Sequence, residues 1–201
     1  HCKHWMMRAA AWVVHAYTAS GLIAGLLSLQ AIFVGNARLA FVWMLVAVLI
    51  DATDGTLARA VQVKRVLPWV DGAKLDDIVD YFTYVIVPVV FLHEFDLLPA
   101  TGTLVFVAAP LFASAFGFCQ AEAKTQDFFF TGFPSYWNIV AFYLYAGGTP
   151  VWINASLICV LAVFVFIPIR YIYPTRTVRL RLLTITLGVG WVVVLLVLLA
   201  Q

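Results

Sequence analysis

Long apolar runs recur along almost the whole chain, and they limit the folds that it can adopt. A helix needs about twenty apolar residues to cross the hydrocarbon core of a bilayer. On that criterion the expected spans lie near residues 11–34, 38–59, 72–93, 101–121, 136–147, 150–169 and 181–200. Only 11% of the residues are charged, less than half of the roughly 25% typical of globular proteins. The sequence therefore predicts an all-α polytopic membrane helix bundle, a single domain over residues 1–201 with about seven transmembrane helices (six to eight).

The fifth expected span is short, and it is separated from the sixth by the turn sequence GGTP at residues 147–150. Length alone allows two full spans or a re-entrant pair. The cations favour two spans, because cytoplasmic loops carry an excess of Lys and Arg. With seven spans and residues 1–10 inside, Arg38 is the one cation placed outside. This topology predicts that residues 51–80 lie at the cytoplasmic face.

Residues 51–80 interrupt the apolar pattern with six of the ten acidic residues of the chain. Charges at the edge of hydrocarbon are costly and usually functional. Asp51 and Asp54 are three residues apart, and Asp76 and Asp80 are four apart, so each pair shares one face of a helix. Two such helices could direct four carboxylates at one spot. Clusters of oxygen ligands suit hard cations such as Mg²⁺, Mn²⁺ or Ca²⁺.

Small residues and an arginine accompany these carboxylates. Gly55, Ala58 and Gly72 would leave room for a bulky group between the two helices. Arg59 would add a cation that can grip phosphate through two hydrogen bonds. Asp71 is expected at the start of the third span, where an acid favours the helix dipole. Metal-binding carboxylates, an arginine and a small-residue cleft together indicate phosphoryl transfer.

The order of these residues resembles the signature of the CDP-alcohol phosphotransferase family. The pattern reads D-x-x-D-G-x-x-A-R over residues 51–59 and G-x-x-x-D-x-x-x-D over residues 72–80. Twelve residues (AVQVKRVLPWVD) separate the two halves, a longer connection than in most members. This connection resembles that of the bacterial phosphatidylcholine synthases.

The resemblance implies a reaction and a set of site residues. A hydroxyl would attack the phosphate of a CDP-linked substrate, and CMP would leave, with Asp80 as the general base. The implied metal ligands, for two Mn²⁺ or Mg²⁺ ions, are Asp51, Asp54, Asp76 and Asp80. The implied CDP-binding residues are Asp51, Asp54, Gly55, Ala58, Arg59 and Gly72.

The longer connection further implies CDP-diacylglycerol as the donor, choline as the acceptor and a bacterial inner membrane as the location. The family also implies a homodimer surrounded by membrane lipids. A quaternary ammonium is held best by aromatic ring faces. The candidate choline-binding residues are Tyr81, Tyr136, Trp137 and Tyr143, with Glu122 as a counter-charge.

Several alternatives stay open at this point. The acceptor could be another alcohol, such as glycerol phosphate, inositol phosphate or serine. For the phosphorylated acceptors, the cations of residues 170–181 could bind the phosphate. CDP-choline with diacylglycerol is a second alternative, and a divalent-cation transporter is a third. The net charge of +2 gives no argument for nucleic acid. Thr18 and Ser20 are placed to reach a nucleotide, whereas His15 is interpreted as a bundle-facing residue.

Overall fold

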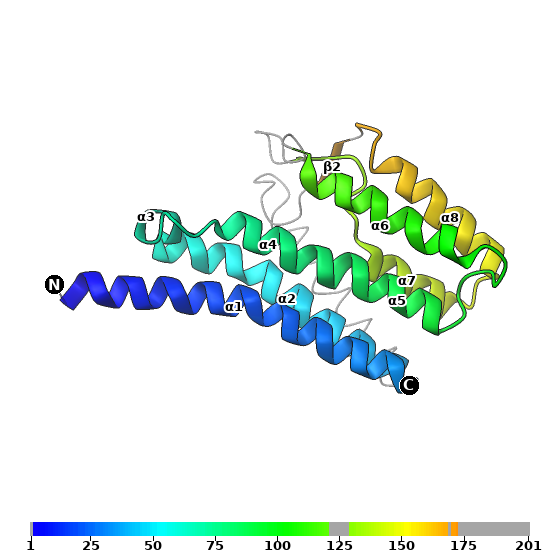
Figure 1. Cartoon of the computed structure of the whole chain (residues 1–201), viewed down its shortest axis with the longest axis horizontal. Helices are drawn as coiled ribbons and strands as arrows, with labels where there is room; N and C mark the ends of the chain where they lie inside the picture. The colour runs from blue at the N-terminus through cyan, green and yellow to red at the C-terminus, as the bar shows by residue number, and fades with distance from the viewer. Residues whose placement is uncertain (1, 121–128, 169, 173–201) are drawn as a thin grey trace.

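The computed structural model describes residues 2–120, 129–168 and 170–172, and this part of the chain is almost entirely helical (Figure 1). The all-α prediction is confirmed. The expected span at residues 181–200 lies outside the described residues. The helices are α1 (Cys2–Phe33), α2 (Ala37–Val61), α3 (Val63–Val66), α4 (Gly72–Asp80), the π-helix η1 (Tyr81–Ile86), α5 (Val87–Glu94), α6 (Thr103–Cys119), α7 (Trp137–Gly147) and α8 (Val151–Phe164).

Two short strands were not expected from the sequence. β1 (Phe129–Thr131) and β2 (Arg170–Ile172) pair antiparallel, with Phe130 opposite Tyr171. Each strand has three residues. The pair links the segment before α7 to the segment after α8 and leaves the helical architecture unchanged.

α1 and α2 form a long helical hairpin (Figure 1). The turn uses Gly35 at φ +73°, and Asn36 caps α2 by accepting a hydrogen bond from the Leu39 amide at 2.9 Å. Ser28 ties the two helices by donating to the Ala40 carbonyl at 2.9 Å. The segments Trp5–Phe33 and Ala37–Val61 are both long and apolar enough to cross a membrane. α1 begins at Cys2 rather than near residue 11, because residues 5–10 are mostly good helix formers.

α4, η1 and α5 follow one another without a break and form a single rod over residues 72–94, close to the expected span at 72–93. Close packing against α1 depends on glycine. A Cβ added at Gly21 would lie 2.6 Å from Val79, and one added at Gly25 would lie 2.5 Å from the Phe82 ring. Small residues at such positions allow helices within a membrane to approach closely. This approach brings α1 alongside the acidic face of α4.

The apolar core lies between α2, α5, α7 and α8. Phe91 is fully buried, and its ring centroid lies 4.5 Å from that of Phe41 on α2. Ile158 of α8 is also fully buried in this cluster. The turn between α7 and α8 uses Gly148 in the left-handed conformation. The fifth and sixth expected spans are therefore separate helices joined at the predicted turn.

Candidate active site

Three carboxylates from two helices converge beside α1. Asp51 belongs to α2, whereas Asp76 and Asp80 lie one turn apart on α4. One oxygen from each residue lies within 4.8 Å of the other two, and all three side chains are half-buried. Oxygens on opposite sides of a cation are about 4–5 Å apart, given metal–oxygen distances of about 2.0–2.6 Å. The three residues could therefore hold a divalent metal ion, as the sequence predicts.

Asp54 lies beside this cluster rather than within it. It is buried, at 5% exposure, and it lies within hydrogen-bonding reach of Thr18 on α1 and of Asp76. The charge of Arg59 acts on its carboxylate. The four predicted carboxylates thus form a chain, in which Asp76 connects the cluster of three to Asp54.

The π-helix η1 adds a tyrosine that sequence reasoning missed. Tyr84 is buried, and its hydroxyl donates a hydrogen bond to Oδ2 of Asp51 at 2.7 Å. π-helical turns are frequent at functional sites. The hydrogen bond fixes the orientation of the Asp51 carboxylate. A signal was present in the sequence, because Tyr84 continues the spacing of four residues from Asp76 to Asp80.

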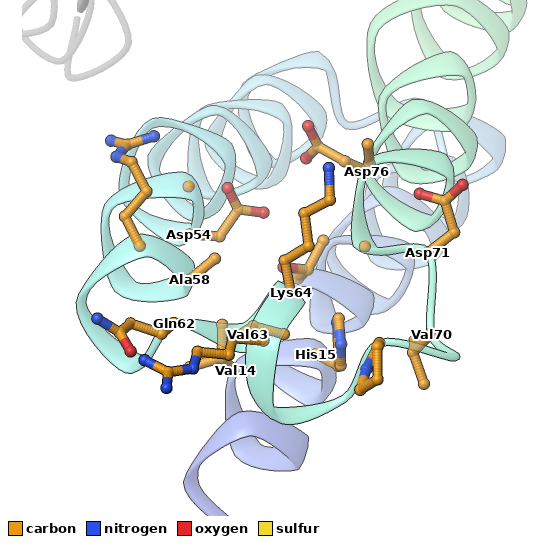
Figure 2. Close-up of a pocket in the computed structure, with 17 residues that line it drawn as sticks. Val14, His15, Asp54, Ala58, Gln62, Val63, Lys64, Val70, Asp71 and Asp76 are labelled. Carbon is orange, nitrogen blue, oxygen red and sulfur yellow. The ribbon is translucent and has the colours of Figure 1, made fainter. Parts of the chain in front are cut away.

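A pocket of about 830 Å³ adjoins the carboxylates, between α1, α2, α3 and the start of α4 (Figure 2). Signature residues from both halves of the motif line it, namely Asp54, Gly55, Ala58, Arg59, Gly72 and Asp76. Asp51 and Asp80 are not among the lining residues. The pocket thus meets the carboxylate chain at its Asp54–Asp76 end.

The glycines of the motif keep this space open. A Cβ added at Gly72 would lie 3.0 Å from the His15 ring, and one added at Gly55 would lie 3.3 Å from the Arg59 guanidinium. Arg59 is exposed, and it donates to the Thr56 hydroxyl at 2.9 Å. This contact leaves most of the guanidinium N–H groups available to a ligand.

The twelve-residue connection forms one wall of the pocket. Gln62 adopts the left-handed conformation at φ 55° and ends α2, where its backbone N–H donates to carbonyls of that helix. α3 starts at the next residue. Lys64 and Arg65 of α3 line the pocket, and Figure 2 shows the Lys64 side chain extending into it. Asp71 caps α4 at the far end of the connection, as predicted, by accepting from the Lys74 amide at 3.1 Å.

Apolar packing holds the connection against the N-terminal half of α1. Val63 and Leu67 are buried in a small cluster with Ala11 of α1. The Arg8 guanidinium lies 5.1 Å from the centre of the exposed Trp69 ring. The N-terminal half of α1 therefore supplies the surface against which this wall packs, and the early start of the helix adds the Arg8 contact.

The candidate choline residues take different positions. Tyr136 is the N-cap residue of α7, and its ring centroid lies 5.8 Å from that of Tyr84. Because Tyr84 is hydrogen-bonded to Asp51, Tyr136 is connected to the carboxylates through one intervening side chain. Tyr81, in η1, donates to the Leu111 carbonyl at 3.0 Å and packs edge-on against Phe118.

Two other candidates lie in different surroundings. Trp137 is completely buried, and its indole N–H donates to Ser114 at 2.8 Å, so neither ring face is open to a ligand in this structure. Tyr143 is 55% exposed on α7. Glu122 lies outside the described residues.

Curated relatives match most of the chain. A phosphatidylcholine synthase of Legionella pneumophila is 48% identical over 83% of the chain and 66% of its own length. One of Pseudomonas aeruginosa is 38% identical over 92% of the chain and 78% of its own length. One of Legionella bozemanae is 44% identical over 76% of the chain and 70% of its own length. The chain belongs to the phosphatidylcholine synthase family.

This membership confirms the resemblance that the long connection between the two motif halves indicates, and it makes the protein a transferase. No family model matches the chain. The chain spans slightly less than two thirds of the Legionella pneumophila phosphatidylcholine synthase, at 66% of its length. Two helices are long and apolar enough to cross a membrane, and they expose apolar side chains such as Leu26 and Leu49 that suit a lipid environment. This member of the family is therefore a membrane protein.

Proposed function

We propose that the protein transfers the phosphatidyl group of CDP-diacylglycerol to choline and releases CMP. The observation that carries this proposal is the continuity of the site. The pocket beside Arg59 is lined by Asp54 and Asp76, and Asp76 also belongs to the cluster of three carboxylates. A nucleotide in the pocket would therefore present its phosphates to the carboxylates. The relatives are named phosphatidylcholine synthases, and we therefore propose phosphatidylcholine as the product.

The cations around the pocket would bind the diphosphate. Arg59 lies in the last turn of α2, and Lys64 and Arg65 of α3 line the same pocket. Guanidinium groups bind phosphate through paired, charge-assisted hydrogen bonds. Gly55 and Gly72 would let the nucleotide approach the helix backbones, because a side chain at either position would take up pocket space and crowd Arg59 or His15.

Four carboxylates would hold the divalent ions, which we propose to be two Mn²⁺ or Mg²⁺ ions. Asp51, Asp76 and Asp80 form the compact group, and Asp54 continues it toward the pocket. When bound, such ions neutralise a diphosphate and stabilise the leaving oxygen. Tyr84 would keep Asp51 in its ligating orientation, as outer hydrogen bonds do in metal sites.

Asp80 would accept the proton of choline. The choline oxygen forms a bond to the phosphorus that carries diacylglycerol, and the bond from this phosphorus to the bridging oxygen breaks. The electron pair of that bond leaves with CMP, and the hydroxyl proton passes to the Asp80 carboxylate. A carboxylate is a weak base for an alcohol, so the proton moves late in the transition state.

Choline would lie on the Tyr84–Tyr136 side of the carboxylates. A quaternary ammonium donates no hydrogen bond and is stabilised by aromatic faces. Of the candidate residues that are described, Tyr136 is linked most directly to the carboxylates, through Tyr84. We therefore place Tyr136 first among the choline-binding residues and Tyr81 second.

The proposed location is a bacterial inner membrane, with the pocket on the cytoplasmic side. Lys64 and Arg65 at the pocket would then face anionic headgroups, each attracted by about 1 kcal/mol. CDP-diacylglycerol could enter from the bilayer and choline from the cytosol. The family resemblance further implies a homodimer, which the mass of the purified protein in detergent would test.

The deciding experiment measures CMP release by the purified protein with CDP-diacylglycerol, Mn²⁺ or Mg²⁺, and choline. We expect release that depends on choline and is lost in Asp80→Asn. Asp96→Asn is the matched control, since Asp96 is exposed just after α5 and belongs neither to the pocket lining nor to the carboxylate cluster. Release with a different alcohol would retain the chemistry and refute the choline assignment. Metal flux into proteoliposomes without CMP release would favour transport instead.

A further inference from the structure

His15 has a buried ring nitrogen that no hydrogen bond satisfies within the described part of the chain. The side chain is 6% exposed and lines the pocket, and its Nε2 atom has no partner there. Buried polar atoms are almost always hydrogen-bonded, and leaving one unpaired is costly. A ligand in the pocket could supply the missing partner.

Packing holds the His15 ring in place. Gly72, at the start of α4, packs against the ring, and a Cβ added to it would lie 3.0 Å from the ring. Trp12, one turn earlier on α1, meets the ring edge-on at 6.1 Å. The ring therefore stays at the pocket surface because the signature motif has glycine at position 72.

The position of His15 along α1 indicates which part of a ligand it meets. Thr18, three residues later, lies within hydrogen-bonding reach of Asp54. His15 shares the face of Thr18 and lies about 4.5 Å farther along the helix axis. Figure 2 shows it displaced along the pocket from Asp54 and Asp76. If the phosphates occupy the carboxylate end, the group beside His15 is the nucleoside.

The ribose offers the chemistry that fits this nitrogen. A neutral imidazole nitrogen either donates or accepts, depending on its tautomer, and a hydroxyl can do both. A ribose hydroxyl therefore satisfies Nε2 in either tautomer. The phosphates, by contrast, only accept hydrogen bonds, and Arg59, Lys64 and Arg65 already line the pocket as their donors.

We propose that Nε2 of His15 hydrogen-bonds a ribose hydroxyl of the CDP group and so favours a ribonucleotide donor. This inference rests on the proposed function, because it requires a CDP-linked substrate. His15 binds the nucleotide and touches none of the reacting atoms.

The test combines a variant with altered substrates. CMP release is measured with CDP-diacylglycerol and with its 2′-deoxy and 3′-deoxy analogues, for the unchanged protein and for His15→Phe. Calorimetry of CMP and dCMP binding gives a second readout that needs no turnover. We expect one analogue to raise the donor KM of the unchanged protein by about 3–10-fold, the equivalent of one hydrogen bond. His15→Phe should raise the KM for CDP-diacylglycerol by the same factor. In this variant the sensitive analogue should have the same KM as CDP-diacylglycerol, and the choline KM should be unchanged.

Control variants separate this effect from a general loss of structure. His15→Gln keeps a group that can donate and accept, and it should recover part of the affinity. His93→Phe makes the same change at an exposed histidine at the end of α5 and should alter neither KM. If each deoxy analogue raises the donor KM of His15→Phe by the same factor as it does in the protein without this substitution, the two effects are independent and the inference is overturned.

Two further outcomes distinguish the inference from the proposed function. If the unchanged protein uses all three donors equally, the inference is wrong and the proposed function stands. If it neither releases CMP from CDP-diacylglycerol with any acceptor nor binds CMP, the proposed function fails, and the inference fails with it.

Discussion

Removing the Tyr84 hydroxyl tests whether orientation of Asp51 controls metal binding. Tyr84→Phe fills the same buried space and deletes one contact, the 2.7 Å hydrogen bond to Oδ2 of Asp51. A hydrogen bond to a charged group is worth about 1.5–3 kcal/mol, which corresponds to about 10–100-fold in metal affinity, the usual loss when an outer partner of a ligand is removed. We expect the Mn²⁺ concentration at half-maximal CMP release to rise by that factor. At saturating Mn²⁺, most of kcat should return.

The control for this prediction is Tyr145→Phe. The Tyr145 ring packs at 5.4 Å from Phe91 in the core, on the far part of α7, so the same chemical change is made away from the carboxylates. Its metal dependence should equal that of the unchanged protein. An unaltered Mn²⁺ titration in Tyr84→Phe would refute the reasoning, and so would a loss of kcat that saturating metal leaves unrepaired.

Three further predictions concern packing, donor binding and the pocket wall. Gly25→Ala would place a Cβ 2.5 Å from the Phe82 ring, so it should lower the free energy of unfolding in detergent by about 1–3 kcal/mol and lower the melting temperature. Gly147→Ala is the control, because its Cβ would make only an ordinary contact, and it should leave the melting temperature nearly unchanged. Arg59→Lys should raise the KM for CDP-diacylglycerol about tenfold or more without changing that for choline, because lysine cannot form the paired phosphate contact; an equal rise in both would contradict this. Trp69→Ala should increase tryptic cleavage within α3, because it removes a cation–π contact worth about 0.5–1 kcal/mol; an unchanged cleavage rate would show that the apolar cluster alone holds this wall.

The helices and the spacing of the carboxylates could be predicted because they depend on local sequence. The rod over residues 72–94 joins the acidic α4 to the apolar stretch over residues 81–92, and its extent was expected from hydropathy and helical period. The same period places Asp76 and Asp80 on one face without any knowledge of the neighbouring helices. Asp71 was predictable as a cap for the same reason, since a cap interacts with backbone amides only a few residues away.

The distribution of roles among these residues could not be predicted, because it depends on how the helices pack. The motif presents four similar aspartates, and the separation of Asp54 from the other three arises from the placement of α4 against α1 and α2. The aromatic residues show the same limit. Tyr136 and Trp137 are adjacent in sequence, yet one meets Tyr84 and the other is completely buried. The two short strands connect segments about forty residues apart and leave no local periodic signal.

The sequence by itself determined the helical membrane architecture, the family and the carboxylate motif, because hydropathy, helical period and residue order are properties of the chain. The tertiary structure alone decided that Tyr84 holds Asp51, that α3 becomes a wall of the pocket, and that His15 has a nitrogen without a hydrogen-bond partner among the described residues. Tyr84 and Asp51 lie 33 positions apart in the sequence, and His15 and its neighbour Gly72 lie farther apart still, whereas α3 directly follows α2. Within a bilayer, apolar helix faces gain no hydrophobic free energy by meeting one another, because lipid tails are equally apolar. The helix partners were therefore selected by close packing, above all through the glycines that bring α1 against α4 and η1.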